Sequence, residues 1–130
     1  MHLIFVYGTL KRGFSNAHLL KNAEFICEAT SRDALYNMVC FQSAKAKDYT
    51  YPAVFDGGAY KVQGELYRVT DAELKALDDL EDESERYKRT PITLDSGHTA
   101  EFYMSMEYDR PTLDRHVELD VETNIQSYRV

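Results

Sequence analysis

Residues 59–81, AYKVQGELYRVTDAELKALDDLE, pass directly from a strand pattern into a helix pattern. Apolar and polar side chains alternate up to Gly64 and the phase shifts there, as it does where a strand has a bulge or where another backbone approaches closely. Thr70 and Glu73 have the spacing of a capping box, which marks the beginning of a helix. We therefore expect a strand over residues 59–69 and, directly after it, a helix that runs through three leucines toward an acidic stretch.

The remaining strand-like runs indicate the fold class. They lie at residues 3–6, 24–31, 34–41, 51–55, 87–94 and 99–106. The last two flank DSGH at residues 95–98, which has the residue types of a hairpin turn, whereas residues 15–21 favour only a short helix and the tail beyond Pro111 gives little signal. About six strands with one clear helix predict an α+β domain with a small, mainly antiparallel sheet and flanking helices. Periodicity alone leaves a closed barrel and a sandwich as alternatives.

Length and charge describe the chain as a whole. Its 130 residues and 15.0 kDa correspond to one domain, residues 1–130, and 44% hydrophobic residues are enough to form a core. With 15 Lys and Arg against 22 Asp and Glu, the net charge is -7, which disfavours a nucleic-acid partner. No segment approaches the roughly 18 apolar residues of a membrane span, so we expect no membrane association.

The cysteines and the N-terminal pattern bear on the cellular compartment. Cys27 and Cys40 are too few for a disulfide framework and lack the spacing of metal ligands. We expect Cys27 to be a small buried side chain. The apolar run at the N-terminus precedes its basic pair, which is the reverse of a secretory signal. These observations favour a reduced, cytoplasmic protein.

Several common catalytic motifs do not occur in the sequence. It has no GxGxxG, GxxxxGK[ST], HExxH or GxSxG pattern, and its four histidines are scattered without the spacing of metal ligands. We therefore expect no metal, no nucleotide cofactor and no serine hydrolase site.

Glu81 is the first candidate for chemistry. On a helix of about 100° per residue counted from Leu74, the leucine stripe is centred near -60° and Glu81 falls at roughly -20°, which is within the stripe. A carboxyl group that faces a core has a raised pKa, and repulsion from Asp78, Asp82 and Glu85 would act in the same direction. A carboxyl group held near neutrality is what a general acid or base needs at physiological pH. The alternative is a frayed helix end with Glu81 in solvent.

The second candidate is the loop after the first strand, YGTL at residues 7–10. Gly8 lets a ligand approach the backbone, and the N–H groups of such a turn form a small nest for a carboxylate or an oxyanion. Lys11 and Arg12 either add attraction for a carboxylate or lie on the surface. The alternative for the whole segment is an ordinary turn at the end of a strand.

Four segments, in this order along the chain, resemble the γ-glutamylcyclotransferase-like superfamily and, within it, the γ-glutamylaminecyclotransferase (AIG2-like) branch. The segments are FVYGTLKRG at residues 5–13, YPAVF at 51–55, GELYRV at 64–69, and LDDLE at 77–81 with the YKR that follows. The resemblance extends from Leu3 to about Met106. It implies a β-barrel with flanking helices, a pocket at the mouth of the barrel, and cofactor-free release of 5-oxoproline from a small γ-glutamyl substrate.

The resemblance also implies roles for individual residues. Glu81, the last residue of LDDLE, matches the catalytic glutamate of the family. The loop that holds the glutamyl part of the substrate is matched by Tyr7, Gly8, Thr9 and Leu10, and Tyr87 is a further candidate for the pocket wall. In the implied reaction Glu81 takes a proton from the α-ammonium group of the substrate, the freed amine attacks the γ-carbonyl, and the departing amine receives the proton.

The chain departs from the family pattern directly after Glu81. A small residue follows in many relatives, whereas here an acidic rim follows, formed by Asp82, Glu83 and Glu85. We expect this rim to disfavour anionic substrates such as glutathione and to favour γ-glutamyl amines, and the loop at residues 42–50 to contribute to specificity. We also expect a monomer or a weak homodimer. Two alternatives stay open: a binding or interaction module on the same fold without turnover, and an enzyme that removes a γ-glutamyl protecting group within a biosynthetic pathway.

Overall fold

The structure is a computed structural model that describes residues 1–8, 10–13, 17–42, 50–81, 86–106, 112–113 (backbone only) and 116–129. These residues form ten strands, one α-helix and one short 3-10 helix. The strands are β1 (His2–Val6), β2 (Glu24–Thr30), β3 (Tyr36–Gln42), β4 (Thr50–Asp56), β5 (Lys61–Val69), β6 (Tyr87–Thr93), β7 (Thr99–Ser105), β8 (Thr112–Leu113), β9 (Val117–Asp120) and β10 (Ile125–Tyr128). The helices are η1 (Ala17–Leu20) and α1 (Asp71–Glu81).

β5 is the central strand of the larger sheet. It pairs antiparallel with β1 through residues 65–69, parallel with β10 through residues 61–62, and antiparallel with β2 along its other edge. β7 and then β6 continue the sheet beyond β1, and β9 continues it beyond β10. A smaller sheet has the strand order β4-β3-β8. Two of these pairs, β1 with β7 and β5 with β10, are parallel, and the others are antiparallel.

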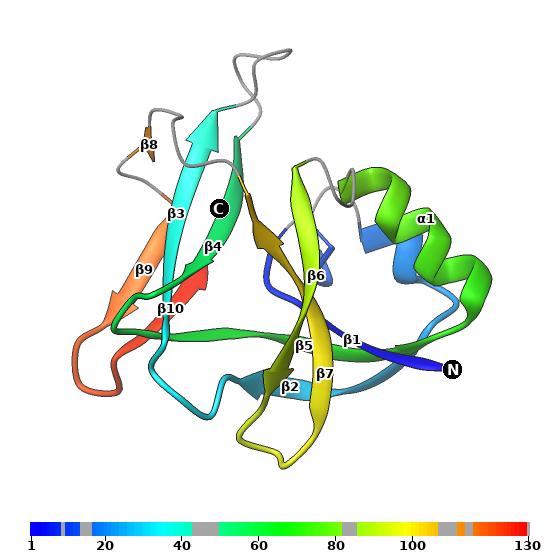
Figure 1. Ribbon diagram of the computed structural model, residues 1–130, viewed down its shortest axis with the longest axis horizontal. Helices are drawn as coiled ribbons and strands as arrows, with labels where there is room; N and C mark the ends of the chain where they lie inside the picture. The colour runs from blue at the N-terminus through cyan, green and yellow to red at the C-terminus, as the bar shows by residue number, and fades with distance from the viewer. Residues whose placement is uncertain are drawn as a thin grey trace.

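The larger sheet curls until its far strands meet. Ser31, directly after β2, forms an isolated bridge with Leu94, directly after β6, and the Arg32 N–H donates a hydrogen bond of 3.0 Å to the carbonyl of Thr93. In Figure 1, α1 and the β3–β4 pair lie on opposite sides of the β6–β7 hairpin. The predicted fold class, a small and mainly antiparallel barrel-like sheet with a flanking helix, is confirmed, although the predicted number of strands is too low.

At Gly64 the backbone of β5 lies close to β1. A Cβ atom on Gly64 would overlap with the carbonyl group of Val6 and with the ring of Phe5. The phase shift in the sequence therefore marks a close backbone approach. The bulge lies in the neighbouring strand β2, between Phe25 and Cys27.

The capping box predicted at the beginning of α1 is present. The Thr70 N–H donates to the Glu73 carboxylate at 2.8 Å, and the Glu73 N–H donates to the Thr70 hydroxyl at 3.1 Å. Leu74 and Leu77 are buried, whereas Leu80 is 36% exposed, so the leucine stripe predicted to be buried is only partly so. Leu80 lies at the edge of the stripe, at about -120° from Leu74, and the buried face is centred nearer to the direction of Glu81.

Two clusters of buried side chains lie on the two faces of β1. Ile4 and Val6 face the cluster that also holds Leu74 and Leu77 of α1, whereas Phe5 faces the other cluster. This alternation is what the period of two residues in a strand requires. β1 therefore packs against α1 on one face and against the interior of the curled sheet on the other.

The C-terminal strands β8 to β10 were not predicted, because the tail beyond Pro111 as a whole is polar and gives little signal. β9 is mostly exposed, and β10 buries the polar Gln126 and Ser127 together with Tyr128. The Gln126 side chain accepts a hydrogen bond from the Met38 N–H at 2.7 Å and donates one to the Met38 carbonyl at 3.3 Å. A side-chain amide thus joins β10 to β3 where a strand would use its backbone.

Smaller expectations have mixed outcomes. Cys27 is half-buried, not buried as expected, because β2 lies at an edge of the sheet, whereas Cys40 is buried; neither cysteine forms a disulfide.

The short helix expected at residues 15–21 is a 3-10 helix over Ala17–Leu20, and residues 15–16 lie outside the described part. In the part of the chain that the structure describes, no helix has the length and apolar character that spanning a membrane requires.

Candidate active site

Glu81 is the last residue of α1 and is half-buried as a residue. Burial raises the pKa of Glu81 to about 7, and the nearby Arg86 guanidinium opposes this shift without cancelling it. The raised pKa agrees with the prediction, but its predicted cause is partly wrong. Burial causes the shift, and repulsion from Asp78 does not contribute; Asp82 and Glu85 lie outside the described residues.

Asp78, one turn before Glu81 on the helix, has partners of its own. It accepts a hydrogen bond of 2.7 Å from the Tyr103 hydroxyl and forms an ion pair with Arg89, whose Nε lies 3.0 Å away. Arg89 also donates to Glu101 at 3.1 Å, so a chain of charges connects α1 with the β6–β7 hairpin. The sequence analysis did not find Tyr103, Arg89 and Glu101. The one available signal was that Asp78 precedes Glu81 by three residues and therefore shares its helix face.

Three buried tyrosines lie around the Glu81 carboxyl group. Tyr7 directly follows β1, Tyr87 begins β6, and Tyr103 belongs to β7. Burial raises the pKa of each of the three hydroxyl groups, and the negative charge of Glu81 raises them further. All three therefore stay protonated at neutral pH, and each already donates its one hydroxyl proton: Tyr7 to the Tyr103 carbonyl, Tyr87 to the Pro52 carbonyl and Tyr103 to Asp78.

Strand pairing explains why these tyrosines meet. β1 runs parallel to β7 with Ile4 opposite Glu101. The residues that follow Ile4 and those that follow Glu101 therefore run in the same direction, next to each other. The Tyr7 hydroxyl accordingly donates a hydrogen bond of 2.7 Å to the carbonyl of Tyr103. Tyr87 is placed next to the same strand because it pairs with Ser105.

Gly8 and Tyr87 meet at Pro52 of β4. A Cβ atom on Gly8 would overlap with the Pro52 ring, and the Tyr87 hydroxyl donates to the Pro52 carbonyl at 3.4 Å. The absence of a side chain at Gly8 is therefore required by the approach of β4. Of the residues predicted for the site, the structure brings together Glu81, Tyr7, Gly8 and Tyr87.

The remaining residues of the predicted loop differ in whether they can face a ligand. The Lys11 N–H donates to the Gly8 carbonyl at 3.0 Å, which closes a turn and leaves the Leu10 N–H outside that hydrogen bond. The Leu10 side chain is buried in the core, so only its backbone can face a ligand. Thr9 lies outside the described residues. Of the basic pair, Lys11 is buried and only Arg12 lies on the surface.

An open polar pocket of about 460 Å³ lies at the end of this loop, and Glu81 is not part of its wall. Its lining residues are Lys11, Arg12, Gly13, Glu28, Gln63, Glu65 and Arg129. Among the residues that the structure describes, no group of three His, Cys, Asp or Glu side chains could hold a metal ion. The acidic rim after Glu81 and most of the loop at residues 42–50 lie outside the described residues.

The chain is similar to proteins of one family along most of its length. A family model described as gamma-glutamyl cyclotransferase, AIG2-like, matches residues 4–122. Gamma-glutamylaminecyclotransferase A of Danio rerio is 40% identical over 96 residues, and the match covers 70% of this chain but only 57% of that protein. A putative gamma-glutamylcyclotransferase of Vibrio cholerae is 34% identical over 111 residues, which cover 84% of this chain and 86% of that one.

Solved structures have the same fold. The crystal structure of an AIG2-like protein from Mus musculus superposes with a TM-score of 0.66 at 26% identity, over 88% of this chain and 86% of that one. Kluyveromyces lactis allophanate hydrolase contains a region that superposes with a TM-score of 0.68 at 14% identity, over 88% of this chain and 20% of that one. The second likeness concerns the fold alone. With the family model matched over residues 4–122, the chain belongs to the gamma-glutamyl cyclotransferase, AIG2-like family.

Proposed function

We propose that the protein is a γ-glutamylaminecyclotransferase, which releases 5-oxoproline and a free amine from a small γ-glutamyl amine. The observation that carries the proposal is the half-buried residue Glu81, whose carboxyl pKa is raised by burial to about 7. Such a group exists in both protonation states at neutral pH, as acid–base catalysis requires. The names of the relatives from Danio rerio and Vibrio cholerae support the same reaction class.

The reaction needs a group that moves protons between two nitrogen atoms. As a carboxylate, Glu81 accepts a proton from the α-ammonium group of the substrate, and the freed α-nitrogen forms a bond to the γ-carbon. The bond from the γ-carbon to the leaving nitrogen then breaks, and protonated Glu81 supplies a proton to that nitrogen. The α-nitrogen sheds two protons over the cycle and the leaving nitrogen gains two, so Glu81 returns to its starting state. Because the attack closes a five-membered ring, the substrate itself supplies most of the proximity.

The loop at residues 7–10 is proposed to hold the glutamyl part of the substrate. Its turn leaves the N–H of Leu10 free of the turn's own hydrogen bond, and backbone N–H groups of this kind bind a carboxylate or a developing oxyanion. The protonated hydroxyl groups of Tyr7 and Tyr87 lie beside Glu81, and we assign both side chains to the wall of the substrate site. No cofactor takes part in these steps, which are proton transfer and acyl transfer only.

The proposal is tested with a panel of γ-glutamyl amines, γ-glutamyl dipeptides and glutathione, with 5-oxoproline detected by mass spectrometry. Glu81→Gln keeps the shape of the side chain and removes the base, and it should lower kcat by about 10²–10⁴-fold. Asp79→Asn is the matched control, because Asp79 is an exposed carboxylate on the same helix that pairs with Lys75. It should leave the rate within about twofold, since exposed ion pairs contribute little.

Three results would contradict parts of the proposal. An undiminished rate of Glu81→Gln would remove Glu81 from the mechanism. A glutathione turnover above that of the γ-glutamyl amines would contradict the preference for amines that the acidic rim predicts. Product from no member of the panel, at high protein concentration, would favour a binding module without turnover.

A further inference from the structure

Glu65 is a buried carboxylate in the middle of the central strand. It is 6% exposed, and in β5 it lies between Val6 of β1 and Glu28 of β2. A carboxylate in such a place is costly to remove from water unless hydrogen bonds satisfy it. The groups that satisfy it therefore indicate what it does.

The partners of Glu65 come mainly from the end of the loop that begins at Tyr7. Its Oε1 atom accepts a hydrogen bond from the Arg12 N–H at 3.0 Å and another from the Tyr67 hydroxyl at 3.0 Å. Its Oε2 atom lies 3.4 Å from Nε of Arg12. One carboxylate thus holds both the backbone and the side chain of Arg12. The Arg12 guanidinium also lies 3.9 Å above the ring centroid of Phe25, which restricts its direction further.

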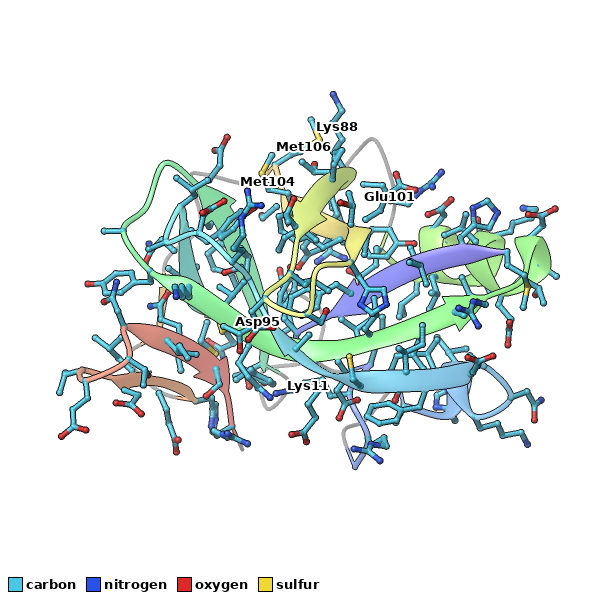
Figure 2. The ribbon with its side chains drawn as sticks, turned by 90° about the horizontal axis from the view of Figure 1, so that it is seen from below. Lys11, Lys88, Asp95, Glu101, Met104 and Met106 are labelled. Carbon is cyan, nitrogen blue, oxygen red and sulfur yellow. The ribbon has the colours of Figure 1, made fainter. Side chains whose placement is uncertain are left out.

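The other loop residues are attached at separate points. The Gly8 position is fixed by Pro52, and the Leu10 side chain is buried in the core. Nζ of Lys11 donates to the carbonyl of Tyr128 at 3.0 Å, and in Figure 2 Lys11 lies on the β2 side of the sheet, far from Lys88. Arg12 is the last of these attachment points, and its backbone is held by a charged acceptor.

We propose that Glu65 is a positioning residue for the substrate loop: by holding Arg12 it keeps the backbone N–H groups of Gly8 and Leu10 in the direction that the glutamyl group requires. The proposal rests on the proposed function in so far as this loop binds the substrate. A displacement of about 1 Å in a positioning group can cost about 10²-fold in rate. A carboxylate whose partners belong to the loop is suited to preventing that displacement, because its own burial is favourable only while the loop stays in place.

The test compares Glu65→Gln and Glu65→Leu with the wild-type protein. Glutamine keeps an acceptor for the Arg12 N–H and loses the charge, whereas leucine loses both and keeps an apolar side chain of similar size. Glu28→Gln is the matched control: Glu28 is exposed, lies opposite Glu65 in the sheet and is 3.9 Å from the same guanidinium, with the same change in net charge. It makes no backbone contact with the loop among the described hydrogen bonds.

Two readouts separate positioning from general stability. Hydrogen–deuterium exchange followed by NMR measures the Arg12 amide against amides of β3, and steady-state kinetics measure kcat and KM separately. We expect Glu65→Leu to speed exchange at Arg12 by about tenfold or more with unchanged exchange in β3. We expect kcat/KM to fall by about 10-fold to 10²-fold with both constants affected, with a smaller effect in Glu65→Gln and less than about twofold in Glu28→Gln.

The outcomes separate this inference from the proposed function. If the wild-type protein releases no 5-oxoproline, the proposed function fails, and the exchange experiment still tests whether Glu65 holds the loop. Unchanged exchange at Arg12 in a folded Glu65→Leu variant would overturn the inference. So would a kcat/KM within about threefold of the wild type, or a loss of stability in all parts of the protein with no local effect at Arg12.

Discussion

Replacement of Glu81 by glutamine should change how the stability of the protein depends on pH. Burial raises the pKa of Glu81 from its ordinary value of 4.5 to about 7, so between these values the folded state holds a proton that the unfolded state has released. Because the folded state binds more protons there, the free energy of unfolding falls as the pH rises. The difference between the two pKa values corresponds to about 3 kcal/mol, absent below pH 4.5 and complete above pH 7.

Urea unfolding of the wild type and of Glu81→Gln, from about pH 4 to pH 8, measures this penalty directly. Glutamine cannot ionise, so its stability relative to the wild type should increase by about 3 kcal/mol across the range and then stay constant. Asp79→Asn should show no such trend, because Asp79 is exposed. A difference between wild type and Glu81→Gln that does not vary with pH would refute the assignment of the raised pKa. A positive result would show that the wild type retains a destabilising carboxylate, as a catalytic group would.

Three further substitutions test the contacts that position the site. Gly8→Ala places a Cβ atom against the Pro52 ring and should cost about 1–3 kcal/mol in urea unfolding, and Pro52→Ala should relieve part of that cost in a double-mutant cycle; strictly additive effects would argue against the contact. Tyr103→Phe removes the donor to Asp78 and should cost about 1 kcal/mol in the same assay, whereas an unchanged midpoint would show that the hydrogen bond is worth nothing. Thr70→Ala removes the cap of α1 and should also cost about 1 kcal/mol, seen as a lower Tm; an unchanged Tm would contradict the cap.

The junction of β5 and α1 could be predicted from the sequence because its signals are local. Each of these signals depends only on residues that are close together in the sequence. They are the alternation of residues 59–69, the capping box at Thr70 and the direction of Glu81 on the helix. Gly64 gave a correct signal as well, since only a close backbone approach or a bulge explains a glycine at that place.

The remaining features depend on contacts between distant segments. β10 could not be predicted, since Gln126 is buried by hydrogen bonds to Met38, 88 residues earlier in the chain, and not by apolar character. The partners of Asp78, which are Tyr103 and Arg89 of the β6–β7 hairpin, are distant in the same way. The sequence therefore indicated that Glu81 faces inward, but it attributed part of the raised pKa to Asp78, whereas burial causes the shift.

The central claim is that burial beside Tyr7 and Tyr87 raises the pKa of the Glu81 carboxyl group to near neutral pH. An NMR titration of the side-chain carboxyl carbons measures this most directly, with the Glu81 signal assigned by its loss in Glu81→Gln. We predict a midpoint near pH 7 for this one glutamate. A midpoint near its ordinary value of 4.5 would contradict the account.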